Sequence, residues 1–461
     1  MHVLFVVHNF LPHHRAGVEA YTQQVAKALA GSMRVTIATT RKVISLPTGT
    51  IRTYRHDGLE VLEVINNLDF GTLDETFANA TMERAFAEVL KRTAPDLVHF
   101  QHLLYWSLGA PRMAKQQGLP TVATLHDYFL MCARMGQMID FRGALCELPD
   151  VDRCAQCMAQ TSFGQSARAA RWIRRLCAVR KRTGIALDRP LRWMNHVLAG
   201  VRRPRGNTSP VANTAAASER WRDAFGRRDA ACRATQDSID RFLTPSVTLR
   251  EAFVRWGFRA EQIQHLPQGL DHAPFRGVER SHGRRLRLAF LGTIAPHKGL
   301  DVLIRAVRQL PAERVELSVF GPKTNAAYAK RCAELAAEAE HIRLHGALAR
   351  SAIPGAYRDI DVLCVPSLWN ECCPLTIQEG YLAGVPSVVS GIGGMAELVD
   401  DGENGLHARP GDVDDWVCAL RRLIDDPDLR DRFAARLPAV PTIDEHVAGL
   451  TEVYVQVGAQ R

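Results

Sequence analysis

Residues 361–380 constrain the fold more than any other stretch, because they predict a buried strand, a short loop and a helix in immediate succession. Residues 361–367 are apolar and of strand length, and Pro374 suits the first turn of a helix, where its missing N–H costs nothing. The helix start leaves the backbone N–H groups of Cys373 and Leu375 free to bind a phosphate beyond the carboxyl end of the strand. This order predicts an α/β fold with a ligand at the junction.

Two glutamates lie at this junction, eight positions apart. Glu371 belongs to the loop and Glu379 to the second helical turn, so their carboxylates can bind two groups of hydroxyls on either side of a diphosphate. A sugar nucleotide has that layout. Two glutamates near a helix start are also common without a ligand, so the interpretation depends on the surrounding sequence.

The surrounding sequence continues with a helix, a strand and a glycine-rich turn. The whole segment, PSLWNECCPLTIQEGYLAGVPSVVSGIGGMAELV, resembles the donor site of the retaining glycosyltransferases of family 4, the group 1 glycosyl transferases. The resemblance implies the α/β fold called GT-B, in which two Rossmann-like domains face a central cleft. It also implies a nucleotide-diphosphate sugar as donor.

Length and composition agree with two domains. A chain of 461 residues that is 46% hydrophobic can form two large cores. It contains no run of about 20 apolar residues that could span a bilayer. Residues 1–7 are too short for the apolar part of a signal peptide and predict a first strand, so we expect a cytoplasmic protein. Its eleven cysteines fit reduced thiols in that compartment.

We expect the domains to divide at a charged, glycine-containing hinge, residues 272–285. The first domain covers residues 1–271 and carries a Cys-containing and basic insertion at about 130–235. The second covers residues 285–440, and residues 441–461 resemble the family's final helix, which crosses back to the first domain.

The first domain opens with a β-α-β pattern, in which Gly17 lies at the start of a helix expected over residues 20–29. Backbone amides at such a helix start can approach a phosphate or an acceptor. The spacing G-x-G-x-x-G is absent here and at residues 391–394, which argues against a dinucleotide-dependent dehydrogenase. By resemblance, Gly17 matches the glycine of the family's first loop, with Ala16 in the place of the usual second glycine.

His126 follows an apolar strand, at the sheet edge where open α/β folds bind ligands. A lone histidine in such a place is more often structural. The phrase Thr124-Leu125-His126-Asp127 resembles the family's acceptor-domain motif, whose histidine contacts the donor sugar near the reacting carbon. His126 is therefore our candidate, ahead of five other histidines: His8, His13, His14, His99 and His102.

The second domain starts with a strand at residues 286–291 and a turn that carries Lys298. A lysine at a helix start can neutralise a diphosphate leaving group without a bound magnesium, so we expect catalysis to require no cofactor. In the family an arginine commonly follows the first glycine of this turn. Thr293 occupies that position, so His297 or an arginine from elsewhere would substitute for it. We expect Gly321 and Gly346 to allow close passage of the nucleotide.

Four cysteines follow His126 at the spacing Cys132-x13-Cys146-x7-Cys154-x2-Cys157, in a stretch predicted to be rich in loops. Four thiols that end in C-x2-C can form a structural zinc site or hold an iron–sulfur cluster. The alternative is four unlinked thiols.

The segment from Arg168 to Arg205 contains twelve Lys or Arg and a single acid, Asp188. Apolar residues, including Trp172 and Trp193, recur in it at helical spacing, which is typical of a segment on anionic headgroups. An ordinary solvated face is the alternative. We expect no nucleic acid as partner, because no recognised nucleic-acid-binding motif accompanies the charge.

Together these features predict a retaining glycosyltransferase that moves a sugar to a glycan or lipid-linked acceptor in polysaccharide or glycoconjugate synthesis. We expect it to lie peripherally on the inner membrane face. His126, Lys298 and Glu371 are the expected catalytic residues. Those expected to bind substrate are Gly17, Thr293, Gly321, Cys373, Leu375 and Glu379. The alternatives are a non-catalytic GT-B relative that binds nucleotide sugar or a phospholipid glycan, and an epimerase or phosphorylase of the same architecture.

Overall fold

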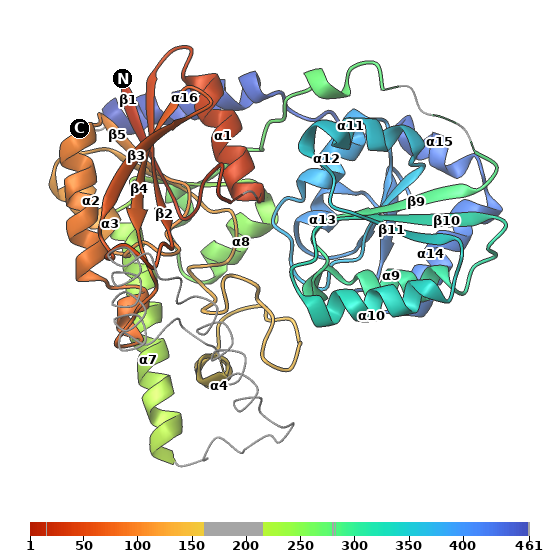
Figure 1. Cartoon of the computed structure of the whole chain (residues 1–461), viewed down its shortest axis with the longest axis horizontal. Coiled ribbons are helices and arrows are strands. Elements are labelled where there is room, and N and C mark those ends of the chain that lie inside the picture. The colour runs from red at the N-terminus through yellow and green to blue at the C-terminus, as the bar shows by residue number, and fades with distance from the viewer. Residues whose placement is uncertain (15, 161–214, 279–280, 282, 460–461) are drawn as a thin grey trace, which may run out of the picture.

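The computed structural model describes residues 1–459 apart from 15, 161–214, 279–280 and 282. Most of the insertion expected at about 130–235, and the basic segment from Arg168 to Arg205, therefore lie outside the described residues. The described chain folds around two sheets with helices on both faces (Figure 1). This agrees with the predicted α/β fold of two Rossmann-like domains.

The first sheet has eight strands in the order β3-β4-β2-β1-β5-β6-β7-β8. All neighbours are parallel except β3 and β4, which form an antiparallel pair. The strand order reverses direction between β1 and β5, and Val3 of β1 is in register with both Val35 and Leu97. The strands are β1 (His2–Val7), β2 (Arg34–Arg41), β3 (Ile51–His56), β4 (Leu59–Ile65), β5 (Leu97–Phe100), β6 (Thr121–Thr124), β7 (Arg241–Thr244) and β8 (Ile263–His265).

The second sheet has six parallel strands in the order β11-β10-β9-β12-β13-β14. Its order reverses between β9 and β12. Open α/β sheets bind ligands at such reversals, beyond the carboxyl ends of the two strands. The strands are β9 (Leu286–Leu291), β10 (Val315–Phe320), β11 (Ile342–Gly346), β12 (Val362–Val365), β13 (Ser387–Ser390) and β14 (Gly405–Ala408).

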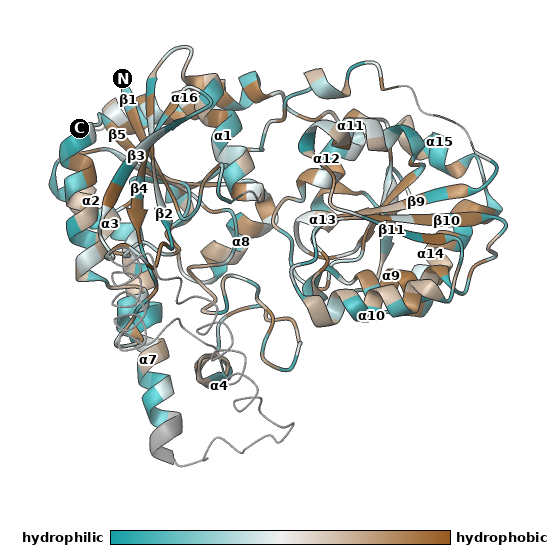
Figure 2. Cartoon of the chain, viewed as in Figure 1, coloured by the Kyte–Doolittle hydropathy of each residue, from teal (hydrophilic) through white to brown (hydrophobic). Residues whose placement is uncertain are grey.

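Helices cover both sheets with their apolar sides inward, so the strands at the centre are apolar and buried (Figure 2). In the first half they are α1 (Gly17–Leu29), α2 (Ala80–Thr93), α3 (Ala110–Gln116), α4 (Val151–Gln160), α7 (Ala215–Arg233) and α8 (Val247–Arg255). In the second half they are α9 (Leu300–Val307), α10 (Ala326–Ala337), α11 (Ile353–Ala356), α12 (Leu375–Leu382), α13 (Gly393–Leu398), α14 (Val413–Asp425), α15 (Leu429–Ala434) and α16 (Ile443–Ala459).

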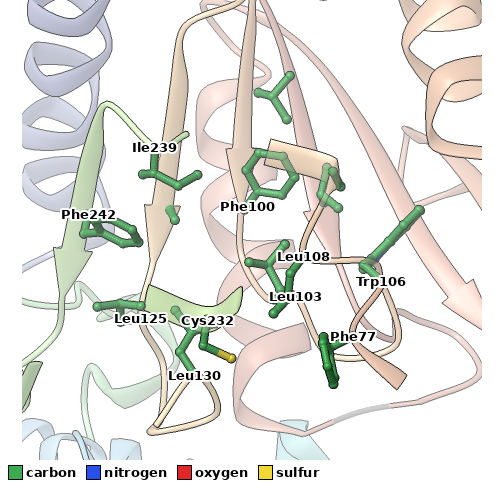
Figure 3. Close-up of a cluster of buried hydrophobic side chains, with 14 of the residues drawn as sticks. Phe77, Phe100, Leu103, Trp106, Leu108, Leu125, Leu130, Cys232, Ile239 and Phe242 are labelled. Carbon is green, nitrogen blue, oxygen red and sulfur yellow. The ribbon is translucent and has the colours of Figure 1, made fainter. Parts of the chain in front are cut away.

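One of the two cores of the first sheet lies beneath the residues that precede His126. Leu125 packs there with Phe100 of β5 and Phe242 of β7, and Cys232 of α7 reaches the same cluster (Figure 3). Large buried side chains on three parallel strands hold the end of β6 in a fixed position. The backbone that carries His126 therefore rests on a packed core.

Helix α16 follows the second sheet in sequence but packs on the first (Figure 1). Leu450, Val453, Tyr454 and Val457 complete a core with β1 and α1. The crossing itself thus agrees with the resemblance. The two halves also touch at α8, where the carboxylate of Glu397 on α13 accepts hydrogen bonds from Val247 N and Thr248 N, both at 2.8 Å. N–H groups without a partner inside the helix favour a carboxylate at a helix start.

Several predicted elements differ from the observed ones. Helix α1 begins at Gly17 rather than at residue 20, because the side chain of Glu19 accepts from Ala16 N at 2.9 Å and supports an earlier start. Pro374 is the N-cap of α12 and not its first residue. The stretch with four cysteines, predicted to be rich in loops, contains helix α4, whose Met158 packs against Phe225 of α7.

Candidate functional site

Two loops meet beyond the carboxyl ends of β9 and β12, at the point where the order of the second sheet reverses. Gly299 has φ +65° and lies so close to the second loop that an added Cβ would be 1.9 Å from the carbonyl oxygen of Pro366. Leu368 N donates to the carbonyl of His297 at 2.8 Å. Only glycine allows this approach, which brings Lys298 next to Glu371.

Lys298 and Glu371 form an ion pair between these loops, 73 positions apart in sequence. Ser367 Oγ donates to the same oxygen of Glu371 at 2.6 Å, and the Lys298 ammonium lies 5.4 Å from the centre of the Trp369 ring. Burial acts to raise the pKa of Glu371, but the charge of Lys298 and the hydrogen bonds bring it below its ordinary value. The site therefore holds a buried carboxylate beside a cation at neutral pH.

A second glycine turn supports the same loop from the other side. An added Cβ on Gly394 would be 2.1 Å from the carbonyl oxygen of Cys372, and Gly394 N donates to Glu371 O at 2.6 Å. Gly393 has φ +57° and lies against Asn370. The loop that carries Glu371 is thus enclosed by two turns that need glycine for close packing.

Cys373 and Leu375 lie on either side of Pro374, at the start of α12. Leu375 is the first residue of this eight-residue helix, and the Cys373 thiol accepts a hydrogen bond from Gln378 Nε2 at 3.0 Å. The structure places both backbone amides at the helix start, as expected. Their binding of a phosphate stays a prediction.

Glu379 lies on the same helix with its side chain buried, and Arg350 Nη1 donates to its Oε1 at 3.1 Å. Burial raises the pKa of Glu379, and Arg350 opposes this rise without cancelling it. Arg350 follows β11 in a short 3-10 turn and was not among the predicted site residues. Nothing in its local sequence distinguishes it, because its partner lies 29 positions away.

Thr293 and Gly321 also lie at this edge of the sheet. Thr293 is half-buried in the loop after β9. An added Cβ on Gly321 would be 1.7 Å from the carbonyl oxygen of Gly292, so glycine is needed there for packing between two protein loops. This is a different reason from the expected passage of a nucleotide. His297 is not a substitute cation, because burial and then Lys298 lower its pKa to about 4.

On the first sheet, His126 follows β6 and is held by hydrogen bonds. Its Nε2 lies 3.0 Å from Gln101 Oε1, which can only accept, so Nε2 carries the hydrogen. Its Nδ1 lies 3.4 Å from Gln268 Nε2, and the ring of Tyr21 is edge-on at 4.9 Å between centroids. Burial, followed by the charge of His102, lowers the pKa of His126 to about 3, so the ring is neutral at pH 7.

Sequence reasoning named the histidines beside His126 only as weaker single candidates and missed their network with two acids. Glu19 is fully buried, and its Oε1 lies 3.1 Å from His14 Nδ1 and 3.4 Å from His8 Nε2. Asp127 Oδ2 lies 3.1 Å from His102 Nε2. His8, His102 and Asp127 lie one, two and three positions after the ends of β1, β5 and β6, so strand ends were the signal that would have grouped them.

Gly17 begins α1 close to this network. It is exposed, and an added Cβ would meet no atom within 4 Å. Space for a ligand therefore exists beside its backbone, but its binding role stays a prediction.

The two sides of the site approach each other at Cys372. This residue directly follows Glu371 yet is buried in the core cluster of the first sheet that contains Tyr128. Burial and then the charges of Asp127 and Glu371 raise the pKa of its thiol. The donor loop of the second sheet therefore lies against the segment that carries His126 and Asp127.

Cys132, Cys146, Cys154 and Cys157 all line a single pocket below the first sheet, away from Lys298 and Glu371. Within the described ranges of the chain, no three side chains of His, Cys, Asp or Glu are arranged to hold a metal ion as they stand. In those same ranges, no helix is both long and apolar enough to cross a membrane.

Comparison with known proteins identifies the family. Residues 273–438 match the family described as glycosyl transferases group 1, and residues 15–144 match Glycosyltransferase Family 4. One match covers the second sheet and the other covers β2 to β6 of the first sheet. The two matches confirm the resemblance to the group 1, family 4 glycosyltransferases seen in the donor segment.

Curated relatives named D-inositol 3-phosphate glycosyltransferase match part of the chain. The one from Stackebrandtia nassauensis is 34% identical over 194 residues, which cover 38% of this chain and 44% of the relative. The one from Thermobispora bispora is 32% identical over 219 residues, which cover 43% of this chain and 50% of the relative. The chain thus spans about half the length, or less, of these relatives.

Solved structures match over nearly the whole chain. Anabaena HepE in complex with UDP and glucose has a TM-score of 0.62 and 16% identity, over 99% of this chain and 100% of that one. Sucrose-phosphate synthase from Thermosynechococcus elongatus has a TM-score of 0.66 and 16% identity, over 100% of both chains. These likenesses show the fold, and the predicted GT-B architecture is confirmed.

Proposed function

We propose that this protein transfers a sugar from a nucleotide-diphosphate sugar to an acceptor hydroxyl, with retention of configuration. The observation that carries the proposal is the Lys298–Glu371 pair at the reversal of the second sheet, against the segment of the first sheet that carries His126. The two family matches support the proposal. So does the Anabaena neighbour, which was solved with UDP and glucose.

The donor would lie beyond β9 and β12. Its diphosphate would be near Lys298 and the amides of Cys373 and Leu375, where a cation and a helix start stabilise the charge that builds up as the glycosidic bond breaks. Glu379 would accept hydrogen bonds from the ribose, and Glu371 from the sugar hydroxyls. Each carboxylate already has a cationic partner, Arg350 or Lys298, which holds it in place before the donor binds.

His126 would contribute as a neutral hydrogen-bonding group. A ring with a pKa of about 3 is a poor general base at neutral pH, because it holds a proton too weakly to accept one from a sugar hydroxyl. In this proposal the departing diphosphate takes the proton of the acceptor hydroxyl, and His126 positions the reacting sugar.

The acceptor would enter beside β1 and β2. A pocket at the carboxyl ends of these strands is lined by Asn9, His13, His14, Arg41 and Lys42 among others. Thr39 lines it too, and its buried hydroxyl has no hydrogen-bond partner. Glu63 lines the same pocket and pairs with Arg41, so these groups suit a polar acceptor such as a glycan or a lipid-linked sugar. Docking on an anionic membrane through the Arg168–Arg205 segment is part of the same proposal.

The first experiment measures donor binding. A thermal-shift panel of UDP-glucose, UDP-N-acetylglucosamine, GDP-mannose and ADP-glucose should single out one donor, because a ligand at 100 times its Kd stabilises the fold by about 2.7 kcal/mol. Slow hydrolysis of that donor then reports bond breaking without knowledge of the acceptor.

The second experiment tests the site residues. Lys298→Gln should lower the rate of hydrolysis about 100-fold or more, since it removes a group that stabilises the leaving diphosphate. Glu379→Gln should weaken donor binding roughly 10-fold, the effect of losing hydrogen bonds to a charged group. Lys330→Gln, on the exposed side of α10, is the matched control. Parental activity in both site variants would contradict the proposal, and binding without hydrolysis or transfer would favour a non-catalytic relative.

A further inference from the structure

Four cysteines from three separate segments converge on one pocket of the first domain. Cys132 lies in a turn, where its N–H donates to the carbonyl of Tyr128 at 2.8 Å. Cys146 follows a small hairpin, and its N–H donates to the carbonyl of Met138 at 2.8 Å. Cys154 and Cys157 are three positions apart on α4, so they share one face of that helix.

The segment between β6 and α4 has little regular structure to hold it. Its hairpin contains one isolated bridge, Ile139 to Leu145, and a side-chain bond of 2.9 Å from Arg134 Nη1 to the carbonyl of Ile139. Met135 and Met138 have φ +54° and +48°, in the left-handed region that is strained for a residue with a side chain. Such a segment keeps one conformation only if another interaction fixes it.

We propose that Cys132, Cys146, Cys154 and Cys157 bind one zinc ion that fixes this segment. Four thiolates are the ligand set of a closed structural zinc site, and the pair on α4 has the spacing C-x2-C that recurs in such sites. The proposal concerns the stability of the first domain and does not depend on the proposed function.

The surroundings of the pocket suit the charge of such a site. A zinc ion with four thiolates carries a net charge of about −2. Arg134 and Arg153 both line the pocket, and together they offset that charge. The backbone at Phe141 forms a hydrogen bond with the Cys157 thiol, and the backbone at Asp150 forms one with Cys154. Bonds of this kind orient the ligands of a metal.

Ligation requires the thiols to turn further into the pocket, because no three of them are arranged to hold an ion as they stand among the described residues. Rotation about χ1 changes where each sulfur points. Two disulfide bonds would be the other way to join these four residues, and the experiment separates the two.

A zinc ion at this site would also fix the loop that packs against Asp127. Gly136 has φ +75° and packs on the segment after His126, where an added Cβ would be 2.8 Å from Phe129 N and 3.0 Å from Asp127 Oδ1. The loop held by the cysteines therefore forms one wall around the Asp127 side chain. Release of the metal would loosen that wall.

The test starts with the unmodified chain, expressed without a histidine tag and purified without chelators. Elemental analysis should find about one zinc per chain. Replacement by cobalt should give the absorption bands of a tetrahedral thiolate site. These two measurements need no variant, so they remain informative even if a variant fails to fold.

Single substitutions test the individual cysteines. Cys132→Ser and Cys157→Ser should each release most of the metal and lower the melting temperature. Cys418→Ser, on the exposed side of α14, should keep both unchanged. Metal well below one equivalent in the unmodified chain would overturn the proposal, whether the four cysteines then prove to be alkylatable thiols or, by mass spectrometry, two disulfides.

Discussion

At the scale of single residues, the candidate site is built from carboxylates that are buried but paired. Burial acts to raise the pKa of Glu19, Asp127 and Glu371, and in each case a specific partner brings it below its ordinary value: His14 for Glu19, His102 for Asp127 and Lys298 for Glu371. Glu379 is the exception, since its pKa stays raised in spite of Arg350. Glu19, Asp127 and Glu371 are therefore charged because of their partners.

Arg350 should accordingly control the charge of Glu379. In Arg350→Met the cation that lowers the pKa of Glu379 is absent, so this pKa should rise further toward neutrality. More of the carboxyl group is then protonated at a given pH, and donor affinity should decline with falling pH from a higher pH in the variant than in the parent. Titration calorimetry with the bound donor at several pH values measures this.

Arg343→Met, which changes an exposed arginine of β11, is the control and should show the parent's pH dependence. The parent's profile in Arg350→Met would mean that Arg350 does not set the protonation of Glu379.

Sequence reasoning located Lys298, Glu371 and Glu379 because each follows a strand or begins a helix in a segment that resembles the family. It did not predict that Lys298 and Glu371 bind each other, because nothing local links residues 73 positions apart. It missed Glu19 for a related reason. The carboxylate lies inside an amphipathic helix and becomes notable only when His8 and His14 fold against it.

At the scale of elements, close packing between turns places the functional groups. The turn that ends at Gly299 and the turn at Gly393 and Gly394 enclose the loop of Glu371 from two sides. These contacts join backbone to backbone, so they tolerate almost no added volume. The position of the Lys298–Glu371 pair thus depends on residues that carry no side chain.

Gly299→Ala should therefore disturb donor binding as well as stability. Its added Cβ would lie 1.9 Å from Pro366 O and must push the two loops apart. We expect a loss of at least about 2 kcal/mol of unfolding free energy beyond the cost of φ alone, and donor affinity should fall with it. Urea unfolding and a binding titration measure the two effects.

Gly402→Ala is the matched control, because Gly402 has φ +78° but open space around its Cβ position. Gly402→Ala should lower the free energy of unfolding only by the strain of the left-handed backbone, about 1–2 kcal/mol. Donor affinity should stay unchanged. Equal losses of stability and affinity in the two variants would show that contact between the loops is not what positions Lys298.

Element boundaries were predicted less well than element types. The strands and helices of the second domain follow clear patterns of apolar residues, and β9 runs over the predicted residues 286–291. Helix α4 was missed although Val151, Cys154, Ala155 and Met158 recur at helical spacing, because a pattern of only ten residues is short. Its Met158 and Cys157 are buried by the neighbouring α7 and hairpin. The residues that bury α4 are distant from it in sequence, so the local pattern of apolar residues does not reveal them.

At the scale of the whole molecule, helix α16 follows the second domain in sequence and packs on the sheet of the first domain. Tyr454 OH lies 2.7 Å from His99 Nδ1, and His446 Nε2 lies 2.6 Å from the hydroxyl of Tyr21, whose ring contacts His126. His99 is fully buried, and burial followed by the charges of His126 and His446 holds its pKa well below the ordinary 6.5. Folding therefore keeps this ring neutral.

This neutral ring predicts a pH dependence of stability. Below pH 6.5 the unfolded chain protonates His99 but the folded chain does not, so stability is greatest above 6.5 and falls as the pH decreases. Each such histidine changes the free energy of unfolding by up to about 1.4 kcal/mol per pH unit. His99→Gln should reduce the slope of unfolding free energy between about pH 5 and pH 6 by this amount.

Thr124→Val is the control for His99→Gln. It removes the partner that lies 2.8 Å from His99 Nε2 but keeps the titrating ring, so it should lower stability and leave the slope unchanged. Urea unfolding at several pH values distinguishes the two. An unchanged slope in His99→Gln would mean that His99 is protonated in the folded protein.

The path of α16 also decides the order in which the molecule can be completed during synthesis. The strands of the second sheet lie within residues 286–408, so that sheet can form as soon as this stretch has left the ribosome. The first sheet is made earlier but lacks Leu450, Val453, Tyr454 and Val457 until the last helix emerges. On the ribosome, the half translated first is therefore the half finished last, and its apolar surface must be kept from aggregating while the second half folds.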